Sequence, residues 1–169
     1  AMLQAVRADP KIGIVGCPSV GEDDRWVPAY ELSYPGRRGS VVRAETQATS
    51  PPVADVAWVS GACLLARRAM IEQVGPLDPD FFMYYEDVDW CYRARQSAWR
   101  VVTLPAEAIR HHLGRAARQV PPELTAQRAV ASRLRFFRKH YSPARAWWLT
   151  VGVVASNLVG WLLWLAPSL

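Results

Sequence analysis

The stretch FFMYYEDVDWCYRAR, residues 81–95, decides how the rest of the chain is interpreted. Four aromatic residues and a methionine run directly into three carboxylates, those of Glu86, Asp87 and Asp89. Carboxylates cost free energy when they leave water, so nearby groups must stabilise them or the protein must use them. The spacing of apolar residues predicts a helix over residues 87–97, with the acids at its start.

Two interpretations of these acids stay open. Free N–H groups and the positive end of a helix stabilise a carboxylate by about 0.3–1 kcal/mol, which would keep Asp87 ionised. An ionised carboxylate fixed between aromatic side chains has the properties of a general base. The simpler alternative, which composition alone favours, is that Glu86 and Asp87 only cap the helix. Asp89 and Arg93, spaced i, i+4, predict a structural ion pair.

Around this stretch, apolar runs and breakers predict strands that alternate with helices. Residues 17–52 are expected to form a long surface loop with one hairpin. The GIVG run at Gly13 and Gly16 lacks the full dinucleotide fingerprint and is interpreted as a turn. The expected elements are a helix over residues 2–10, a strand over 11–16, a strand over 56–66 interrupted by Gly61, a helix over 67–74 and a strand over 99–104.

The bulk composition restricts the class of protein. A chain of 169 residues, half of them apolar, is long enough for one domain with a sizeable core. The formal net charge of +5 indicates an anionic partner such as phosphate, a membrane surface or nucleic acid. No nucleic-acid-binding motif is present, so we expect no nucleic acid. Three cysteines without a CxxC pair favour a reducing compartment.

The sequence predicts two helices after the main domain. Residues 123–145 contain no acid after Glu123, and their apolar residues follow helical spacing, which predicts a basic amphipathic helix. Residues 146–169 predict a hydrophobic, membrane-associated helix. Its uncharged part, residues 146–166, would be about 31 Å long, close to the thickness of the hydrocarbon layer.

Tryptophans at both ends of the uncharged run favour contact with a membrane interface: Trp147, Trp148, Trp161 and Trp164. Spanning the bilayer and lying flat in its surface are equally compatible with this pattern. The basic residues just before the run favour the cytoplasmic face of the plasma membrane.

The order of motifs over residues 58–112 adds a resemblance to these observations. WVSGACLLARRAMIEQVGPLDPDFFMYYEDVDWCYRARQSAWRVVTLPAEAIRHH resembles the family 2 glycosyltransferases of the GT-A fold, and among them the rhamnosyltransferase-like enzymes. The shared pattern runs from Ser-Gly-Ala through Phe-Phe, Tyr and Glu-Asp-x-Asp to Trp-Arg, Pro and His. It implies an α/β fold: an incomplete GT-A domain with a mixed sheet and flanking helices. Residues 1–122 would be its C-terminal, acceptor-side part.

The resemblance also implies roles for individual residues. Asp87 would be the catalytic base, and Glu86 would orient the acceptor or share that role. His111 would face a divalent metal, Mg²⁺ or Mn²⁺; without the resemblance, His111 and His112 are a pair of partly exposed strand histidines. Residues expected to line the acceptor site are Trp58, Ser60, Gly61 and Ala62.

The implied activity is an inverting transfer of a sugar from a nucleoside-diphosphate donor to a lipid-linked or cell-envelope glycan. The family's nucleotide-binding half and its Asp-x-Asp motif are expected upstream of Ala1, so we expect this chain alone to bind the donor weakly. The hydroxyl of a Gly-x-Ser motif that the family commonly has after the histidine is replaced at Ala116. The alternative function is a non-catalytic membrane-docking module whose basic helix binds anionic lipid.

Overall fold

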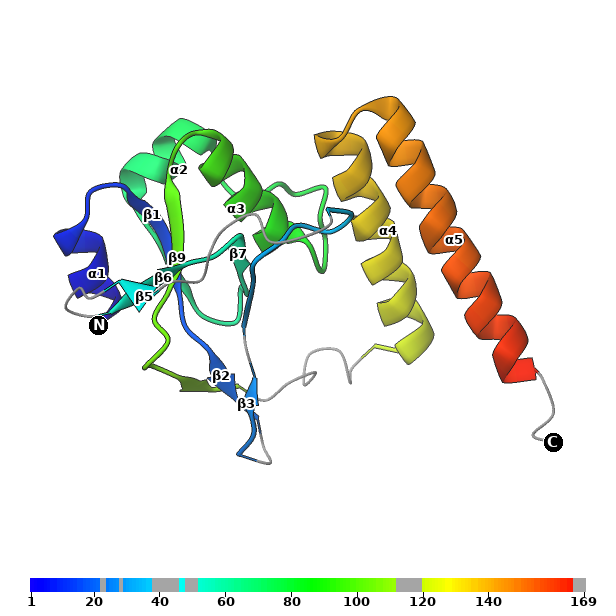
Figure 1. Ribbon diagram of the computed structural model, residues 1–169, viewed down its shortest axis with the longest axis horizontal. Coiled ribbons are helices and arrows are strands. Elements are labelled where there is room, and N and C mark those ends of the chain that lie inside the picture. The colour runs from blue at the N-terminus through cyan, green and yellow to red at the C-terminus, as the bar shows by residue number, and fades with distance from the viewer. Residues whose placement is uncertain (22–23, 28, 38–45, 48–51, 112–119, 166–169) are drawn as a thin grey trace.

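The computed structural model describes residues 1–21, 24–27, 29–37, 46–47, 52–111 and 120–165 (Figure 1). The helices are α1 (Met2–Ala8), α2 (Arg68–Val74), α3 (Glu86–Gln96), α4 (Pro122–His140) and α5 (Pro143–Leu165). The strands are β1 (Ile12–Gly16), β2 (Ser19–Val20), β3 (Trp26–Val27), β4 (Tyr30–Glu31), β5 (Thr46–Gln47), β6 (Val53–Asp55), β7 (Trp58–Val59), β8 (Leu64–Ala66), β9 (Arg100–Thr103) and β10 (Ile109–Arg110).

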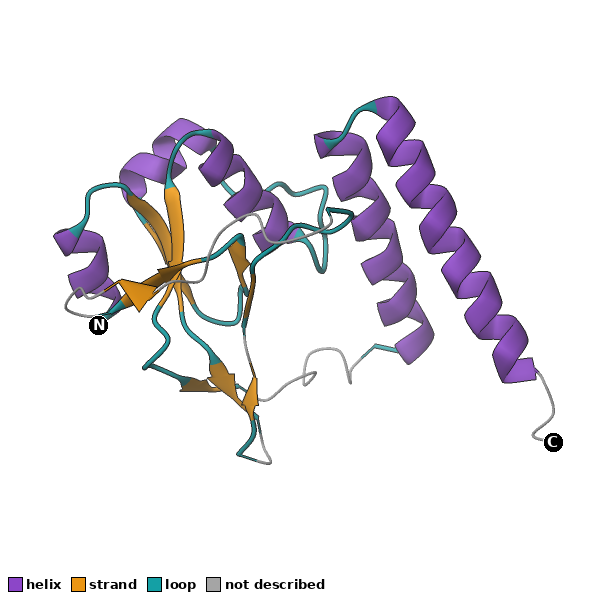
Figure 2. Ribbon diagram, in the orientation of Figure 1, coloured by secondary structure: helices purple, strands orange, loops and turns teal. Residues whose placement is uncertain are grey.

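A mixed five-stranded sheet, in the order β5-β6-β9-β1-β8, forms the centre of the molecule. β1 and β9 are parallel, whereas β8 and β6 run antiparallel to their neighbours. The hairpin β2–β3 pairs with β10, and β4 pairs with β7. Figure 2 shows α1 on one side of the sheet and the pair α4–α5 on the other. The α/β class is therefore confirmed, as are the strands, helices and hairpin predicted between residues 11 and 104, apart from the strand over residues 56–66. The surface loop predicted over residues 17–52 is wrong in part, because this segment also contributes β4 and β5, which pair with β7 and β6.

The single strand predicted over residues 56–66 is wrong. β7 belongs to a small sheet with β4, and β8 pairs with β1 in the central sheet. The chain turns between them at Gly61 and Ala62, which are exposed. One continuous apolar run thus fills two different sheets, because residues on both sides of the turn face the same core. Periodicity does not distinguish this arrangement from one long strand.

Two glycines of β1 permit close packing, and the turn predicted at GIVG is in fact part of a strand. A Cβ atom on Gly13 would lie 2.8 Å from Cβ of Trp99, and one on Gly16 would lie 2.7 Å from Cβ of Val59. Real Cβ atoms do not approach this closely, so only glycine fits at these two positions without a shift of its neighbours. These residues are therefore required by packing at the centre of the sheet.

The apolar face of α4 packs against the protein. Phe136 and Phe137 are fully buried in a cluster that includes Val88 of α3 and Val153 of α5. Tyr34 reaches the same cluster and donates a hydrogen bond from its hydroxyl to the carbonyl of Ala57, at 2.7 Å. The helix α4 is thus attached to the site-bearing helix α3 by a shared core.

The helix α5 runs antiparallel to α4 along its outer side (Figure 1). The break between the two helices, at Tyr141 and Ser142, precedes the point at which charge disappears from the sequence. Large apolar side chains of α5 remain exposed: Trp147, Trp148, Val151, Val154, Leu158 and Val159. The side chains of Trp161 and Trp164 lie outside what the structure describes. Among the described residues, no helix combines the length and the apolar character needed to cross a bilayer.

Candidate active site

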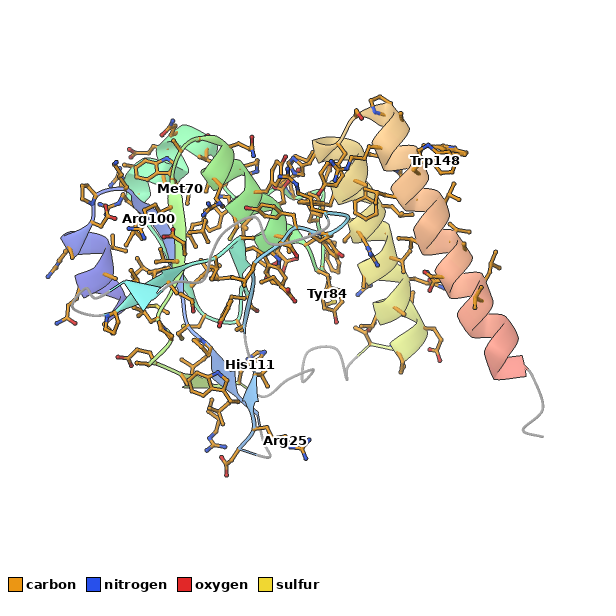
Figure 3. All side chains as sticks on the ribbon, in the orientation of Figure 1. Arg25, Met70, Tyr84, Arg100, His111 and Trp148 are labelled. Atoms are coloured by element: carbon orange, nitrogen blue, oxygen red, sulfur yellow. The ribbon has the colours of Figure 1, made fainter. Side chains whose placement is uncertain are left out.

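The loop that leads into α3 has an unusual backbone. Tyr84 and Tyr85 have positive φ angles of 66° and 70°, consecutively, in the left-handed region that residues with a Cβ atom rarely adopt. Such residues cost of order 1–3 kcal/mol each and persist where the surrounding structure holds them. Figure 3 shows Tyr84 at the outer end of this loop. The two tyrosines turn the chain so that Glu86 and Asp87 open the helix, as the sequence predicted.

The Asp87 carboxylate is held by two backbone N–H groups. Oδ2 accepts a hydrogen bond from the N–H of Gly61 at 2.8 Å, and Oδ1 accepts one from the N–H of Val88 at 2.8 Å. The first bond joins the start of α3 to the turn between β7 and β8, 26 residues earlier in the chain. The structure thus brings together two residues that the resemblance assigned to one site.

The turn beside Asp87 contains the other predicted acceptor residues. Ser60 and Ala62 flank Gly61, and the Ser60 hydroxyl accepts a hydrogen bond from the N–H of Ala62 at 3.2 Å. Gly61 is exposed, and a Cβ atom there would meet only Oδ2 and Cβ of Asp87, at 3.6 and 3.8 Å. The glycine therefore leaves one side of the carboxylate uncovered.

Burial changes the proton affinity of both acids at the start of α3. Loss of hydration raises the pKa of Asp87 above its ordinary value of 3.8, and the hydrogen bonds from Gly61 and Val88 offset only part of this effect. Burial likewise raises the pKa of Glu86, and the neighbouring charge of Asp87 adds to the shift. A carboxylate with a raised pKa is a stronger base than an exposed one.

Two buried polar atoms near this site have no hydrogen-bond partner among the described residues. They are Oε2 of Glu86, an acceptor when ionised, and Nε1 of Trp58, a donor. Buried polar atoms are normally paired, so an unpaired one calls for an explanation. Both residues were predicted from the sequence to act in the site, and the hydroxyl groups of a sugar could satisfy both atoms.

His111 is placed apart from these residues. Its N–H donates a backbone hydrogen bond to the carbonyl of Val20, at the end of β10. Figure 3 shows its side chain near the β2–β3 hairpin, away from the start of α3. No three His, Cys, Asp or Glu side chains group as metal ligands in the described part of the chain. These residues therefore do not form a metal site by themselves, and His112 lies outside the described residues.

Asp89 connects α3 to α4 through a network that the sequence did not predict in full. The expected pair is confirmed, since Oδ2 of Asp89 lies 2.7 Å from Nε of Arg93. Oδ1 also lies 2.8 Å from Nζ of Lys139 and 2.6 Å from Nε2 of His140. Burial alone would raise the pKa of Asp89, but its bonds to His140, Lys139 and Arg93 lower it to about 2.

Arg93 and Trp90 attach α3 to the end of α2. Arg93 donates to the carbonyls of Val74 and Pro76, at 2.7 and 2.8 Å, and Nε1 of Trp90 donates to the carbonyl of Gly75 at 2.8 Å. These bonds satisfy carbonyl groups at the helix end that have no partner within the helix. The acids of α3 thus divide into Asp89, which holds helices together, and Asp87, which remains open on one side.

The chain is similar in sequence to known glycosyltransferases. Residues 1–135 match the family model described as "Glycosyltransferase like family 2". N-acetylglucosaminyl-diphospho-decaprenol L-rhamnosyltransferase from two strains of Mycobacterium tuberculosis is 44% identical over 62 residues, 37% of this chain and 20% of the relative. The low-salt glycan biosynthesis hexosyltransferase Agl10 of Haloferax volcanii is 47% identical over 36 residues, 21% of this chain and 12% of the relative.

These matches cover only a fifth or less of the relatives' own length. The family model, in contrast, covers most of this chain and includes β1, the turn at Gly61, and the whole of α3. The chain belongs to glycosyltransferase family 2.

Proposed function

We propose that this chain is the acceptor-side part of an inverting glycosyltransferase of the GT-A fold. The donor would be a nucleoside-diphosphate sugar, and the acceptor a lipid-linked or cell-envelope glycan. One observation carries the proposal: the Asp87 carboxylate, fixed by the Gly61 N–H at 2.8 Å, lies at an exposed turn and has a raised pKa. The mycobacterial relative, named for a rhamnosyl transfer to a decaprenol-linked diphosphate sugar, supports this choice of acceptor class.

Asp87 acts as the general base in the proposed reaction. One carboxylate oxygen of Asp87 accepts the proton of the acceptor hydroxyl. At the same time, the hydroxyl oxygen attacks the anomeric carbon of the donor sugar. A new carbon–oxygen bond forms, the bond to the diphosphate breaks on the opposite face, and the nucleoside diphosphate departs. The Gly61 N–H keeps the carboxylate in one orientation throughout, and the raised pKa strengthens it as a base.

Glu86 and Trp58 bind the acceptor sugar in this proposal. The unpaired oxygen of Glu86 would accept a hydrogen bond from a sugar hydroxyl, and Nε1 of Trp58 would donate one. A bound sugar would thereby satisfy two buried atoms whose lack of partners costs of order 1–3 kcal/mol each. The turn of half-buried Ser60 and exposed Gly61 and Ala62 would form the adjoining wall.

Enzymes of this family generally use a divalent metal, which offsets the charge of the departing diphosphate. The described residues do not fit such an ion by themselves, because no three ligands group together and His111 lies away from α3. The contribution of His111 to a Mg²⁺ or Mn²⁺ site is therefore proposed only together with carboxylates from outside the described residues. The steps above involve only the carboxylate, the hydroxyl and the sugar.

A second function, membrane attachment, is supported by the outer face of α5. Trp147 and Trp148 are 58% and 66% exposed. The polar side chains of Thr150, Ser156 and Asn157 all bond to carbonyls of their own helix, which lowers the cost of placing α5 in an apolar environment. We propose that α5 lies in the membrane surface, at the cytoplasmic face, where a lipid-linked acceptor would be available.

Replacing the carboxylate of Asp87 by an amide tests the enzymatic proposal. Asp87→Asn in the full-length protein keeps an oxygen that can accept from the Gly61 N–H but cannot remove a proton. We expect transfer of labelled sugar to fall by a factor of about 10²–10⁴, with thermal unfolding and vesicle binding unchanged. Asp78→Asn, at a half-buried carboxylate paired with Lys139 outside this site, is the control. Equal transfer by Asp87→Asn and wild type would leave only the membrane-docking function.

A further inference from the structure

A cavity of about 130 Å³ lies between the helix α4 and the loop that leads into α3. Its walls combine two guanidinium groups with apolar surface, a combination not used by the reaction described above. The residues that line it are Asp80, Phe82, Met83, Arg128, Ala131, Ser132 and Arg135.

The loop wall of this cavity is fixed to α4. The hydroxyl of Ser132 donates a hydrogen bond to the carbonyl of Met83 at 2.9 Å, and Arg135 donates to the carbonyl of Asp80. Both contacts use backbone carbonyls of the loop. The loop backbone is therefore fixed independently of any ligand that the loop side chains bind. The cavity is therefore formed before a ligand arrives, which reduces the ordering that binding requires.

The charges at the cavity favour an anion. Arg128 forms no ion pair within the described part of the chain, and its guanidinium lies over the ring of Phe82 at 4.9 Å. Arg135 has only a loose contact with the carboxylate of Asp80, at 3.9 Å, and the Asp80 side chain is 75% exposed. Two guanidinium groups against one solvated carboxylate leave a surplus of positive charge, and guanidinium groups match phosphate oxygens well.

The apolar side of the cavity is exposed. Phe82, at 77%, is the most exposed large apolar side chain in the described residues. On the outer side of α4, away from the cavity, α5 runs antiparallel, and its C-terminal half, with exposed Leu158 and Val159, lies at the end of the helix pair that carries Arg128 (Figure 1). An anion-binding cavity next to apolar surface suits a ligand that joins a phosphate group to a hydrocarbon chain.

The distance to Asp87 fits an acceptor of this kind. Four Cα–Cα steps separate Met83 from Asp87, at most about 15 Å, and the shared loop lies between them. A diphosphate in the cavity could therefore present the first sugar attached to it to the Asp87 carboxylate.

We propose that this cavity binds the diphosphate of a polyprenyl-diphosphate-linked acceptor. Arg128 and Arg135 contact the phosphate oxygens, and Phe82 with Met83 contacts the first isoprenoid units. The inference rests on the proposed function, whose acceptor it specifies. It assigns α4, through its two arginines, a direct part in acceptor binding.

Binding of farnesyl diphosphate to the full-length protein, measured by calorimetry, tests the proposal. We expect Arg128→Gln and Arg135→Gln each to weaken binding by about tenfold or more. Arg138→Gln, which removes an exposed charge of α4 outside the cavity, should change it by less than about twofold. Farnesol and inorganic diphosphate should each bind more weakly than farnesyl diphosphate, because each supplies half of the recognised chemistry.

Three outcomes would overturn the proposal. Unchanged affinity in both cavity variants would show that the ligand binds elsewhere. Inorganic diphosphate binding as tightly as farnesyl diphosphate would indicate a free-phosphate site, and stronger binding of a nucleoside diphosphate with the same arginine dependence would indicate a donor site. The proposed glycosyltransferase function is tested separately, because it fails if Asp87→Asn retains sugar transfer. Asp87→Asn is expected to bind farnesyl diphosphate as wild type does, whether or not it retains transfer.

Discussion

Asp87 and Asp89 lie two residues apart in the first turn of α3, yet the pKa values of their carboxylates are shifted in opposite directions. Asp87 is held by backbone N–H groups only, and burial raises its pKa. Asp89 is fully buried among Arg93, Lys139 and His140, whose bonds lower its pKa to about 2. The fold therefore favours the charge on Asp89 and disfavours it on Asp87, which separates a structural acid from the one that we propose to act as the base.

This difference predicts that the change from Asp to Asn has unequal effects on stability at the two positions. Asp89→Asn leaves Lys139 and Arg93 facing a neutral side chain in a buried setting, and we expect the free energy of unfolding to fall by about 3 kcal/mol. Asp87→Asn removes a charge that the folded state disfavours, which offsets the loss of one of the two hydrogen bonds that the carboxylate accepts, so stability should stay within about 0.5 kcal/mol. Urea unfolding of both variants beside wild type measures the two changes. A larger loss in Asp87→Asn than in Asp89→Asn would reverse the assignment.

The lowered pKa of Asp89 also predicts acid sensitivity. Its folded value of about 2 lies below the ordinary value of 3.8, so its contribution is complete above pH 3.8 and is lost as the pH falls toward about 2. The contribution amounts to roughly 2 kcal/mol. Asp9 and Asp78 also have lowered pKa values and act in the same direction. The unfolding free energy, measured across this range, should fall less steeply in Asp89→Asn than in wild type; parallel curves would contradict the prediction.

Catalysis should show a pH limit of its own. A general base works only when deprotonated, and the pKa of Asp87 is raised above 3.8 by burial. We therefore expect kcat/KM of the full-length protein to decline on the acidic side at a pH higher than 3.8, while the fold is still intact. The pH profile of the transfer rate, with circular dichroism at each pH, separates this limit from unfolding. The residual activity of Asp87→Asn should not show this decline at acidic pH. If the decline persisted in the variant, the titration would belong to another group.

Sequence reasoning located Asp87, Gly61 and the start of α3 because the signals were local or carried by an ordered run of motifs. It missed that Asp89 binds His140, since 51 residues separate them and no short pattern connects the two. It predicted the strand over residues 11–16 but interpreted Gly16 within it as part of a turn, because steric crowding against Val59 depends on which strands pack together. Local patterns thus predicted helices and strands, whereas contacts between distant elements required the fold.

The packing of Gly16 can be tested against a glycine in open surroundings. In Gly16→Ala the new Cβ atom would lie 2.7 Å from Cβ of Val59, close to the backbone, so the strand must shift. We expect a loss of about 1–3 kcal/mol in the free energy of unfolding. Gly152→Ala, within α5 with nothing inside 4 Å of the added atom, should instead gain about 0.5–1 kcal/mol. Equal effects of the two substitutions in thermal and urea unfolding would show that β1 tolerates a side chain there.

Membrane attachment should depend on the two exposed tryptophans of α5. Trp147 and Trp148 pack edge to face, with ring centroids 4.6 Å apart, and Figure 3 shows Trp148 on the outer side of the helix. Burying such a side chain contributes about 2 kcal/mol, so the double variant Trp147→Ser with Trp148→Ser should bind vesicles at least about tenfold more weakly. Sedimentation with vesicles of anionic and neutral phospholipid measures this, and Trp26→Ser, at a tryptophan that is 51% exposed on β3, is the matched control. If the control lost as much binding as the double variant, the contact would be a general effect of exposed tryptophan rather than a property of α5.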